Sequence, residues 1–433
     1  MISENSIESV DSALTKAISY VSQNIGCYVT NPGIDFSRHR NLTDEVLIRF
    51  LIQLQAKSIN SELCDYFLNQ SPPTASAFCQ QRVKLDPEAL ARVFHLFSDT
   101  APITNTWKGY QILACDGSDI NIPYNPSDQE TFVQSDPSVK GYNQLHLNAL
   151  YDVLNGIFTN VMIDAKHKSH ESGALIEMYE HFMPERSSIL TADRGYERYE
   201  LLAFLIENSL LFAIRVKDIE SNGILSGLNL PDGEFDIDVT RILTRSQTKE
   251  IKENREKYTF LPSNVNFRYL DFDHETYELK FRVVRFKITD DTYECLVTNL
   301  PRGEFSPSDL KELYHLRWSE EGSFRKLKYD VGMIDFHSKK QSNVRQEIYA
   351  SLILYNYTQL LINVVPIKKE NQYVYKANFA TAVTNARLFF KRLIDQREII
   401  KRIKNFLIPI RPGRKFKRNI KGQSAKLFLY RAS

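Results

Sequence analysis

The stretch from Tyr314 to Lys328, YHLRWSEEGSFRKLK, holds a tyrosine, an arginine, a glutamate and a lysine at offsets 0, 3, 7 and 14. On an α-helix, which advances roughly 100° per residue, these four side chains share one stripe about 60° wide. Leucines and a phenylalanine occupy the neighbouring sector, which is the expected core-facing side. Taken alone, the stripe is better explained by an ion pair between Arg317 and Glu321 on a solvated face. Two motifs upstream favour a functional interpretation.

Each upstream motif is an aspartate that directly follows a short apolar run. Asp116 follows Tyr110–Cys115 and Asp193 follows Ser188–Ala192, and glycine comes within two residues of each. Reactive side chains collect at strand ends in open sheets, and a nearby glycine allows close approach of backbone or substrate. Either motif alone is also consistent with a plain turn. Together with a helix-borne Glu321, the three carboxylates can bind two Mg²⁺ ions about 3.5–4 Å apart for phosphoryl transfer.

These motifs resemble those of the DDE transposases of bacterial insertion sequences, in the branch marked by Y-x2-R-x3-E-x6-K. The residues that match this signature are Tyr314, Arg317, Glu321 and Lys328. Residues 116–118 match the family's D-x-[ST] segment, and residues 193–196 match its D-x-G-[YF] segment. The resemblance covers roughly residues 105–365. It implies an α/β (α+β) protein with an RNase H-like catalytic core, interrupted by a β-rich insertion between the second aspartate and the glutamate.

The resemblance also implies an activity. The chain would bind the terminal inverted repeats of an insertion sequence, cut the DNA and join the free 3′-OH ends to double-stranded target DNA. The implied ligands of two Mg²⁺ ions, for which Mn²⁺ can substitute, are Asp116, Asp193 and Glu321. The implied phosphate contacts are Tyr314, Arg317 and Lys328, which offer a hydroxyl donor, a bidentate guanidinium and a point charge. A homodimer in the DNA complex is expected, because two element ends must be held together.

The chain divides into five predicted regions. They are a helical DNA-binding region at 1–104, the first part of the core at 105–217, a β-rich insertion at 218–300 that includes strands returning to the core, the second part of the core with the glutamate helix at 301–365, and a basic C-terminal region at 366–433 for DNA contact or dimerisation. In the first region, Thr43, Thr74 and Asp86 are predicted helix caps, and Asn60 or Ser61 a fourth. The helix after Thr74 is polar and resembles the third member of a helix-turn-helix, although any small helical bundle looks similar.

Composition limits the other possibilities. The net charge is +2, yet residues 399–433 carry eleven Lys or Arg and no acid, which favours a polyanionic partner. Five scattered cysteines without a C-x-x-C pair argue against structural zinc and disulfides, and they fit a reducing cytoplasm. Residues 348–367 lack charge but contain several amides and hydroxyls, so they predict a buried helix and no membrane span. We therefore expect a cytoplasmic protein that associates with the nucleoid when it binds DNA.

Two alternatives share most of these features. One is a structure-selective DNA nuclease of the same fold, which cleaves without joining. The other is a catalytically inactive DNA-binding protein derived from a transposase. The sequence itself does not separate them, nor does it show whether a hairpin intermediate forms.

Overall fold

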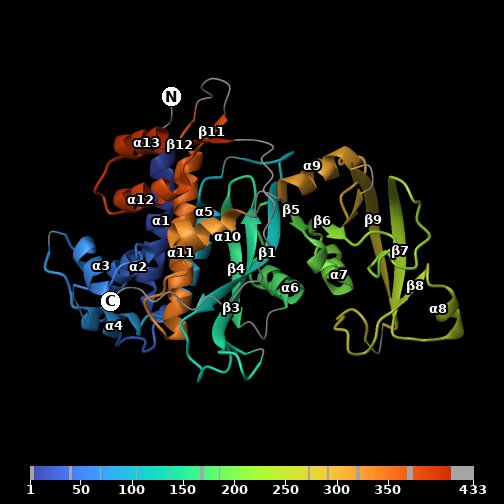
Figure 1. The fold of residues 1–433 in the computed structure, drawn as a ribbon, viewed down its shortest axis with the longest axis horizontal. Helices are drawn as coiled ribbons and strands as arrows, with labels where there is room; N and C mark the ends of the chain where they lie inside the picture. Colours follow the sequence, from blue (N-terminus) through green and yellow to red (C-terminus); the bar gives the residue numbers. More distant parts are fainter. Residues whose placement is uncertain are drawn as a thin grey trace.

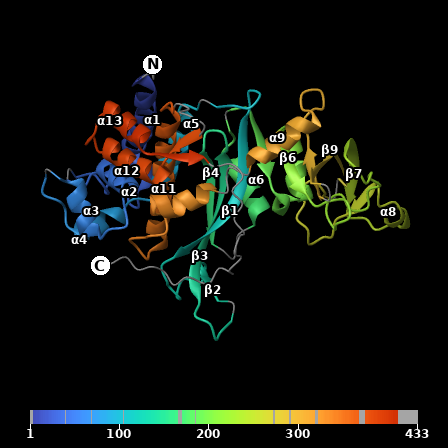
Figure 2. The same ribbon diagram turned by 45° about the horizontal axis from the view of Figure 1, so that its top comes forward.

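The computed structural model describes residues 4–38, 41–68, 70–103, 105–134, 136–165, 170–184, 186–271, 274–289, 292–317, 322–367 and 374–410. Figure 1 shows helices from both ends of the chain gathered on one side, a large sheet in the middle and a β-rich arm on the far side. The turned view in Figure 2 shows the end of the sheet near β2 projecting away from the helices. The chain therefore forms a mixed α/β protein with a large central sheet.

The N-terminal region is helical, as predicted. Its elements are α1 (Glu4–Gln23), the 3₁₀ turn η1 (Ile25–Tyr28), α2 (Asp44–Ile52), α3 (Ile59–Tyr66), α4 (Ala75–Arg82) and α5 (Pro87–Thr100). The predicted caps of α2, α4 and α5 are confirmed, since Thr43, Thr74 and Asp86 each accept a hydrogen bond from a backbone N–H of the first turn. The predicted cap of α3 is wrong: Ser58 caps this helix, which begins at Ile59.

Helix α4 does not present all its polar residues to solvent. Gln81 and Arg82 are buried, and the Arg82 guanidinium donates hydrogen bonds to the Gln346 side chain at 2.9 Å and to the Asn343 carbonyl at 2.6 Å. A buried guanidinium that satisfies its donors on the protein is not available to a DNA base or phosphate. Arg82, one of the polar residues expected on the exposed face of this helix, therefore binds helix α11 (Gln341–Asn363) instead.

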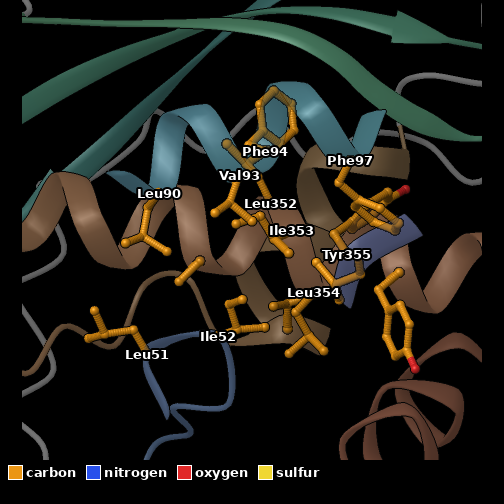
Figure 3. Packing of buried hydrophobic residues seen from close by; sticks show 14 of the residues in the cluster. Leu51, Ile52, Leu90, Val93, Phe94, Phe97, Leu352, Ile353, Leu354 and Tyr355 are labelled. Carbon is orange, nitrogen blue, oxygen red and sulfur yellow. The ribbon is translucent and has the colours of Figure 1, made fainter. Parts of the chain in front are cut away.

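Helix α11 joins the N-terminal helices to the rest of the chain. Figure 3 shows its buried side chains packed against those of α2 and α5. The labelled members are Leu51, Ile52, Leu90, Val93, Phe94, Phe97, Leu352, Ile353, Leu354 and Tyr355. Each such side chain contributes about 1.5–3 kcal/mol by leaving water. The prediction of a buried helix at 348–367 is confirmed for α11, and no helix in the described ranges is long and apolar enough to cross a membrane.

The central sheet has ten strands. Its first half consists of β1 (Gln111–Ile122), β2 (Phe132–Val133), β3 (Tyr142–Asp152), β4 (Ile157–Ala165), β5 (Ser188–Ala192) and β6 (Leu211–Val216). Strand β3 lies antiparallel between β4 and β1, and β1, β5 and β6 are parallel neighbours. Helices α5 and α11 cover one face of this half of the sheet. Helices α6 (Glu171–His181) and α7 (Tyr199–Glu207) pack against its other face (Figure 1).

The β-rich segment extends the same sheet. Its strands are β7 (Phe235–Thr244), β8 (Tyr258–Phe260), β9 (Thr276–Thr289) and β10 (Thr292–Thr298), with α8 (Lys249–Glu253) between β7 and β8. The order continues β6-β10-β9-β7-β8, because β10 pairs antiparallel with β6. Residues of α7, β6, β7, β9 and β10 share one apolar cluster. The segment is therefore continuous with the core sheet, and it forms the arm on the far side in Figure 1.

After β10 the chain returns to the helical side. The remaining elements are α9 (Pro307–Arg317), α10 (Ser323–Arg325), the π-helical turn η5 (Lys326–Val331), α11, β11 (Val374–Ala377), α12 (Phe379–Phe390), α13 (Gln396–Asn405) and β12 (Leu407–Ile410). Strands β11 and β12 form a separate two-stranded sheet. Eight of the eleven basic residues in 399–433 fall within 411–433, outside the described part of the chain.

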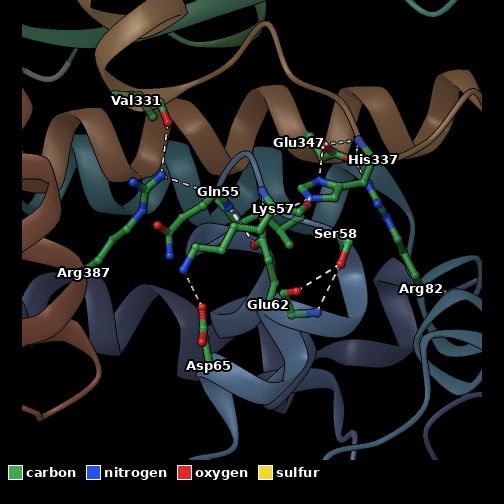
Figure 4. Close-up of polar contacts among 12 residues, drawn as sticks. Gln55, Lys57, Ser58, Glu62, Asp65, Arg82, Val331, His337, Glu347 and Arg387 are labelled. Atoms are coloured by element: carbon green, nitrogen blue, oxygen red, sulfur yellow. Dashed lines mark hydrogen bonds and ion pairs between the residues drawn. The ribbon is translucent and has the colours of Figure 1, made fainter. Parts of the chain in front are cut away.

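A buried ionic cluster adds polar contacts between the N-terminal helices and α11 (Figure 4). His337 lies between two carboxylates, with Nε2 at 3.1 Å from Glu62 Oε1 and Nδ1 at 3.1 Å from Glu347 Oε2. Arg82 completes the cluster at 2.9 Å from Glu347. Burial by itself would raise the pKa of Glu347, but Arg82 and His337 outweigh it and hold that pKa below its ordinary value.

Candidate active site

The two aspartate motifs meet at the centre of the sheet. Strands β1 and β5 are parallel, and Cys115 pairs in register with Ala192, so Asp116 and Asp193 follow side by side. Strand β5 ends at Ala192, as predicted, whereas β1 continues through Asp116 to Ile122 and pairs only with β3 there. The predicted end of the first strand at Cys115 is therefore wrong. Asp116 marks the point at which β1 leaves its parallel neighbour.

The electrostatics of Asp116 reflect this closeness. Burial raises the pKa of Asp116, a hydrogen bond from the Gly117 N–H at 2.8 Å lowers it, and the charges of Asp193 and Glu171 raise it again. Arg317 is near enough to lower it. Carboxylates that oppose one another's ionisation in this way favour a cation between them. Asp193 itself accepts a hydrogen bond from the Gly195 N–H at 2.7 Å, which fixes its turn.

Tyr314 and Arg317 come from the last turn of α9. Tyr314 is only 1% exposed and belongs to the apolar cluster beneath β5, β6 and β10. The Arg317 guanidinium carbon lies 5.2 Å from the centre of the Tyr314 ring, a cation–π distance. Burial raises the pKa of the Tyr314 phenol, against the charges of Arg317 and Arg215. Because this hydroxyl has no accessible surface, a direct phosphate contact from it would require α9 to move.

Lys328, the last residue of the signature, contacts strand β1, which carries Asp116. Its ammonium group donates to Ser118 Oγ and to the Asp119 carbonyl, both at 2.7 Å. Burial lowers the pKa of Lys328, and the charge of Asp119 opposes this. The contacts bring the fourth signature residue within two residues of Asp116 along β1. Such proximity could not be read from a separation of more than two hundred positions in sequence.

Lys328 does not lie in a regular α-helix. The described part of α9 runs to Arg317, α10 spans Ser323–Arg325, and Lys328 lies in the π-helical turn η5. A π-helical turn has more residues per turn than an α-helix, so the phase assumed for a single stripe does not extend to Lys328. Glu321, the predicted third carboxylate, falls within 318–321 and lies outside the described residues. Its role as a ligand stays a prediction.

A second polar group beside Asp116 was not recognised from the sequence. Asp119 follows in β1, His146 opposes it on β3, and Glu171 opens helix α6. Asp119 lies within the strand, and its Oδ1 is 2.6 Å from His146 Nδ1. The signal that could have indicated the group is continuation of the strand past Asp116 to Ile122, because register with β3 then sets His146 opposite Asp119.

Comparison with known proteins assigns the family. The sequence profile of the transposase DDE domain matches residues 107–357, which is more than half of the chain. The chain belongs to the DDE transposase family. A search of curated protein sequences returned no significant match. Among solved structures, the transposase resembles a piggyBac transposase synaptic complex with hairpin DNA, with 12% identity, a TM-score of 0.42 and coverage of 96% of this chain and 87% of that one. A TM-score of this size does not establish a common fold.

The carboxylates of Asp116 and Asp193 are the type of ligand that divalent cations such as Mg²⁺ prefer. Asp116 and Asp193 supply hard oxygen donors at adjoining strand ends, and their mutual repulsion fits a cation. Within the described residues, no group of three or more His, Cys, Asp or Glu is arranged to hold a metal ion. The predicted third ligand is outside that part of the chain. The two aspartates therefore fit a divalent cation but leave its coordination incomplete.

A cavity of about 910 Å³ opens beside Asp193 in the transposase. Helix α6, the start of α7 and the loops of the β-rich segment line it. Its basic lining residues are Arg194, Arg198, Lys217 and Arg268. Arg194 and Arg198 are exposed, whereas Arg268 pairs with Glu180 and Glu200. Exposed cations next to a carboxylate centre provide contacts for a polyanion without neutralising the carboxylates.

Proposed function

We propose that this transposase binds the terminal inverted repeats of an insertion sequence, cuts the DNA by two-metal phosphoryl transfer and joins the 3′-OH ends to target DNA. The observation that carries the proposal is the register of β1 and β5, which sets Asp116 beside Asp193. In the order β4-β3-β1-β5-β6, strand β3 runs antiparallel to the other four strands, which supports an RNase H-like core.

In this proposal Asp116, Asp193 and Glu321 hold the divalent cations, Mg²⁺ or Mn²⁺. When bound, the cations supply Lewis-acid stabilisation of the attacking and leaving oxygens. Arg317, stacked on the Tyr314 ring and close to Asp116, offers its fork of donors to a phosphate at the scissile position. Lys328 holds the Ser118 segment of β1 and adds positive charge behind the carboxylates. Tyr314 acts mainly by supporting Arg317, and its predicted phosphate contact awaits a DNA-bound state.

In this proposal the DNA duplex lies along the cavity beside Asp193. Arg194 and Arg198 would bind backbone phosphates on the side of the β-rich arm. Phosphate contacts of this kind position the duplex without reading its sequence. The basic residues of 411–433 would add contacts elsewhere on the DNA, and a homodimer would hold the two element ends.

The test is a joining reaction with labelled terminal repeats, a target plasmid and Mg²⁺. The transposase should yield joined product, whereas a structure-selective nuclease would yield cleaved DNA only. Asp116→Asn, Asp193→Asn and Glu321→Gln should each abolish cutting and joining while DNA binding in a gel-shift assay is retained. If all three variants join DNA as well as the wild type, the assignment of these carboxylates is wrong. If the wild type binds the repeats but never cuts them, the inactive DNA-binding protein is the better description.

A further inference from the structure

Three polar side chains from three elements, β1, β3 and α6, lie in series beside Asp116 and Asp193. Asp119 Oδ1 lies 2.6 Å from His146 Nδ1, and His146 Nε2 lies 3.7 Å from Glu171 Oε1. The His146 side chain is 6% exposed, whereas that of Glu171 is 42% exposed and open to a ligand. Asp119 and His146 are thus an internal support, and Glu171 is the end that faces outward.

The His146 and Glu171 side chains lie directly over Gly117, the glycine after Asp116. A Cβ placed on Gly117 would lie 2.4 Å from His146 Nε2, closer than real Cβ atoms approach, and it would lie 3.1 Å from Glu171 Oε1. The glycine is required here for this close approach, since its backbone is ordinary strand. The Asp-Gly pair of the first motif therefore has a structural reason: it admits a histidine and a glutamate to the space beside Asp116.

Glu171 also reaches the second aspartate. A Cβ on Gly195 would lie 2.9 Å from Asp193 Oδ1 and 3.5 Å from Glu171 Oε2, so both carboxylates border the same glycine. The charge of Glu171 also raises the pKa of Asp116. Glu171 therefore lies between the two motifs and borders both.

A buried atom without a partner indicates that something binds here. His146 Nε2 has no accessible surface and no hydrogen-bond partner among the described residues, and 3.7 Å to Glu171 is too long for a hydrogen bond. An unsatisfied buried polar atom of this kind costs about 1–3 kcal/mol unless a rearrangement or a bound group satisfies it. Small rotation of the half-exposed Glu171 carboxylate, fixed by a ligand on its other oxygen, would satisfy it.

We propose that Glu171 is a further acid of the reaction centre, which binds a water of the divalent cation held by Asp116 and Asp193, and that His146 and Asp119 position its carboxylate. A water-mediated contact fits the described acids, because no three of them are arranged as a direct ligand sphere. The inference rests on the proposed function. Glu171 is the acid that touches the bound group, and His146 and Asp119 act through it as positioning residues.

The experiment measures Mn²⁺ binding to the full-length transposase without DNA, by calorimetric titration, together with the shift of the melting temperature caused by Mn²⁺. Glu171→Gln should weaken Mn²⁺ binding about tenfold and reduce the shift, as loss of outer contacts does in metal sites. His146→Gln should weaken binding by a smaller factor. The matched control is Glu177→Gln, an exposed acid on the same helix, which should leave the Mn²⁺ affinity at the wild-type value.

Wild-type Mn²⁺ affinity in Glu171→Gln would overturn the inference. If that variant melts early without metal, Glu171→Asp replaces it; this variant keeps the charge but shortens its reach, so weakened binding supports the inference and unchanged binding overturns it. Asp193→Asn separates the two proposals. If Asp193→Asn abolishes joining while Glu171→Gln binds Mn²⁺ normally, only this inference fails; if Asp193→Asn joins DNA normally, the proposed function fails.

Discussion

At the residue scale, close packing and hydrogen bonds restrict which side chains two positions of the site can carry. Gly117 is the clearest case, because His146 and Glu171 occupy the space that any side chain would need. Lys328 is the second, because its ammonium group is tied to β1 by two hydrogen bonds of 2.7 Å. Both residues act on the strand that carries Asp116. Their substitution should therefore affect stability and chemistry together.

Gly117→Ala should destabilise the fold by about 1–3 kcal/mol, since the added methyl group overpacks against a buried ring. Denaturant unfolding of the metal-free protein measures this effect, and the joining assay should show a matching loss. Gly303→Ala is the control, because nothing lies within 4 Å of its added Cβ and its backbone is not left-handed. Equal stability of the two variants would contradict the packing described here.

Lys328→Met keeps the length of the side chain but removes both hydrogen bonds to β1. Loss of the hydrogen bonds to the Asp119 carbonyl and the Ser118 hydroxyl should lower the free energy of unfolding by about 1–3 kcal/mol. Thermal melting without DNA reports this loss, which a residue that only contacts phosphate would not cause. The neighbouring exposed cation provides the comparison: Arg325→Met should melt like the wild type.

At the element scale, helix α9 and strands β1 and β5 determine which signature residues meet. The spacing in sequence correctly predicted an α-helix through Arg317, because its apolar positions recur at helical period. It did not predict the π-helical turn at Lys326–Val331, because tertiary contacts, including those of Lys328 to β1, decide the pitch there. It also ended β1 at Cys115, since Asp-Gly is a turn signal, whereas pairing with β3 continues the strand to Ile122.

Two substitutions of Tyr314 distinguish its possible roles. Tyr314→Phe keeps the ring under Arg317, so joining activity and stability should stay close to wild type if the ring is the functional part. A large loss of joining in Tyr314→Phe, with stability retained, would instead show that the hydroxyl contacts phosphate. Tyr314→Ala should cost about 3–5 kcal/mol in the free energy of unfolding, because it leaves a cavity in a packed cluster.

At the scale of the whole molecule, the N-terminal helices and the catalytic sheet are joined by one apolar core and one ionic cluster (Figures 3 and 4). The predicted boundary at residue 104 does not correspond to a break in packing, because α1, α2 and α5 share their core with α11 and α12. Helix α11 is the common element.

The ionic cluster should make stability depend on pH. Arg82 and His337 hold the pKa of buried Glu347 below its ordinary value of 4.5, so this group stabilises the fold above that pH. The contribution should be lost as the pH falls through the lower folded-state pKa. Glu347→Gln should cost about 3–5 kcal/mol at neutral pH, because Arg82 is left buried without its partner, and should flatten the acid side of the stability profile.

Urea unfolding between pH 7 and pH 3 measures that profile. Glu45→Gln removes an acid from a half-exposed i,i+4 pair with Arg49 and serves as the control. It should cost about 0–1 kcal/mol, with the acid slope unchanged. If Glu347→Gln matched this control, the cluster would be energetically unimportant.

The sequence by itself determined the family signature, the α/β class, the N-terminal helices and three of their caps, and the two aspartates at strand positions, because each depends on local pattern. The tertiary structure alone decided which residues surround those aspartates. His146 meets Asp119 through strand register, Lys328 meets Ser118 across 210 positions, and Glu171 reaches both glycines from the start of a helix. Such contacts depend on pairing and packing between distant segments, and no local period in the sequence encodes them.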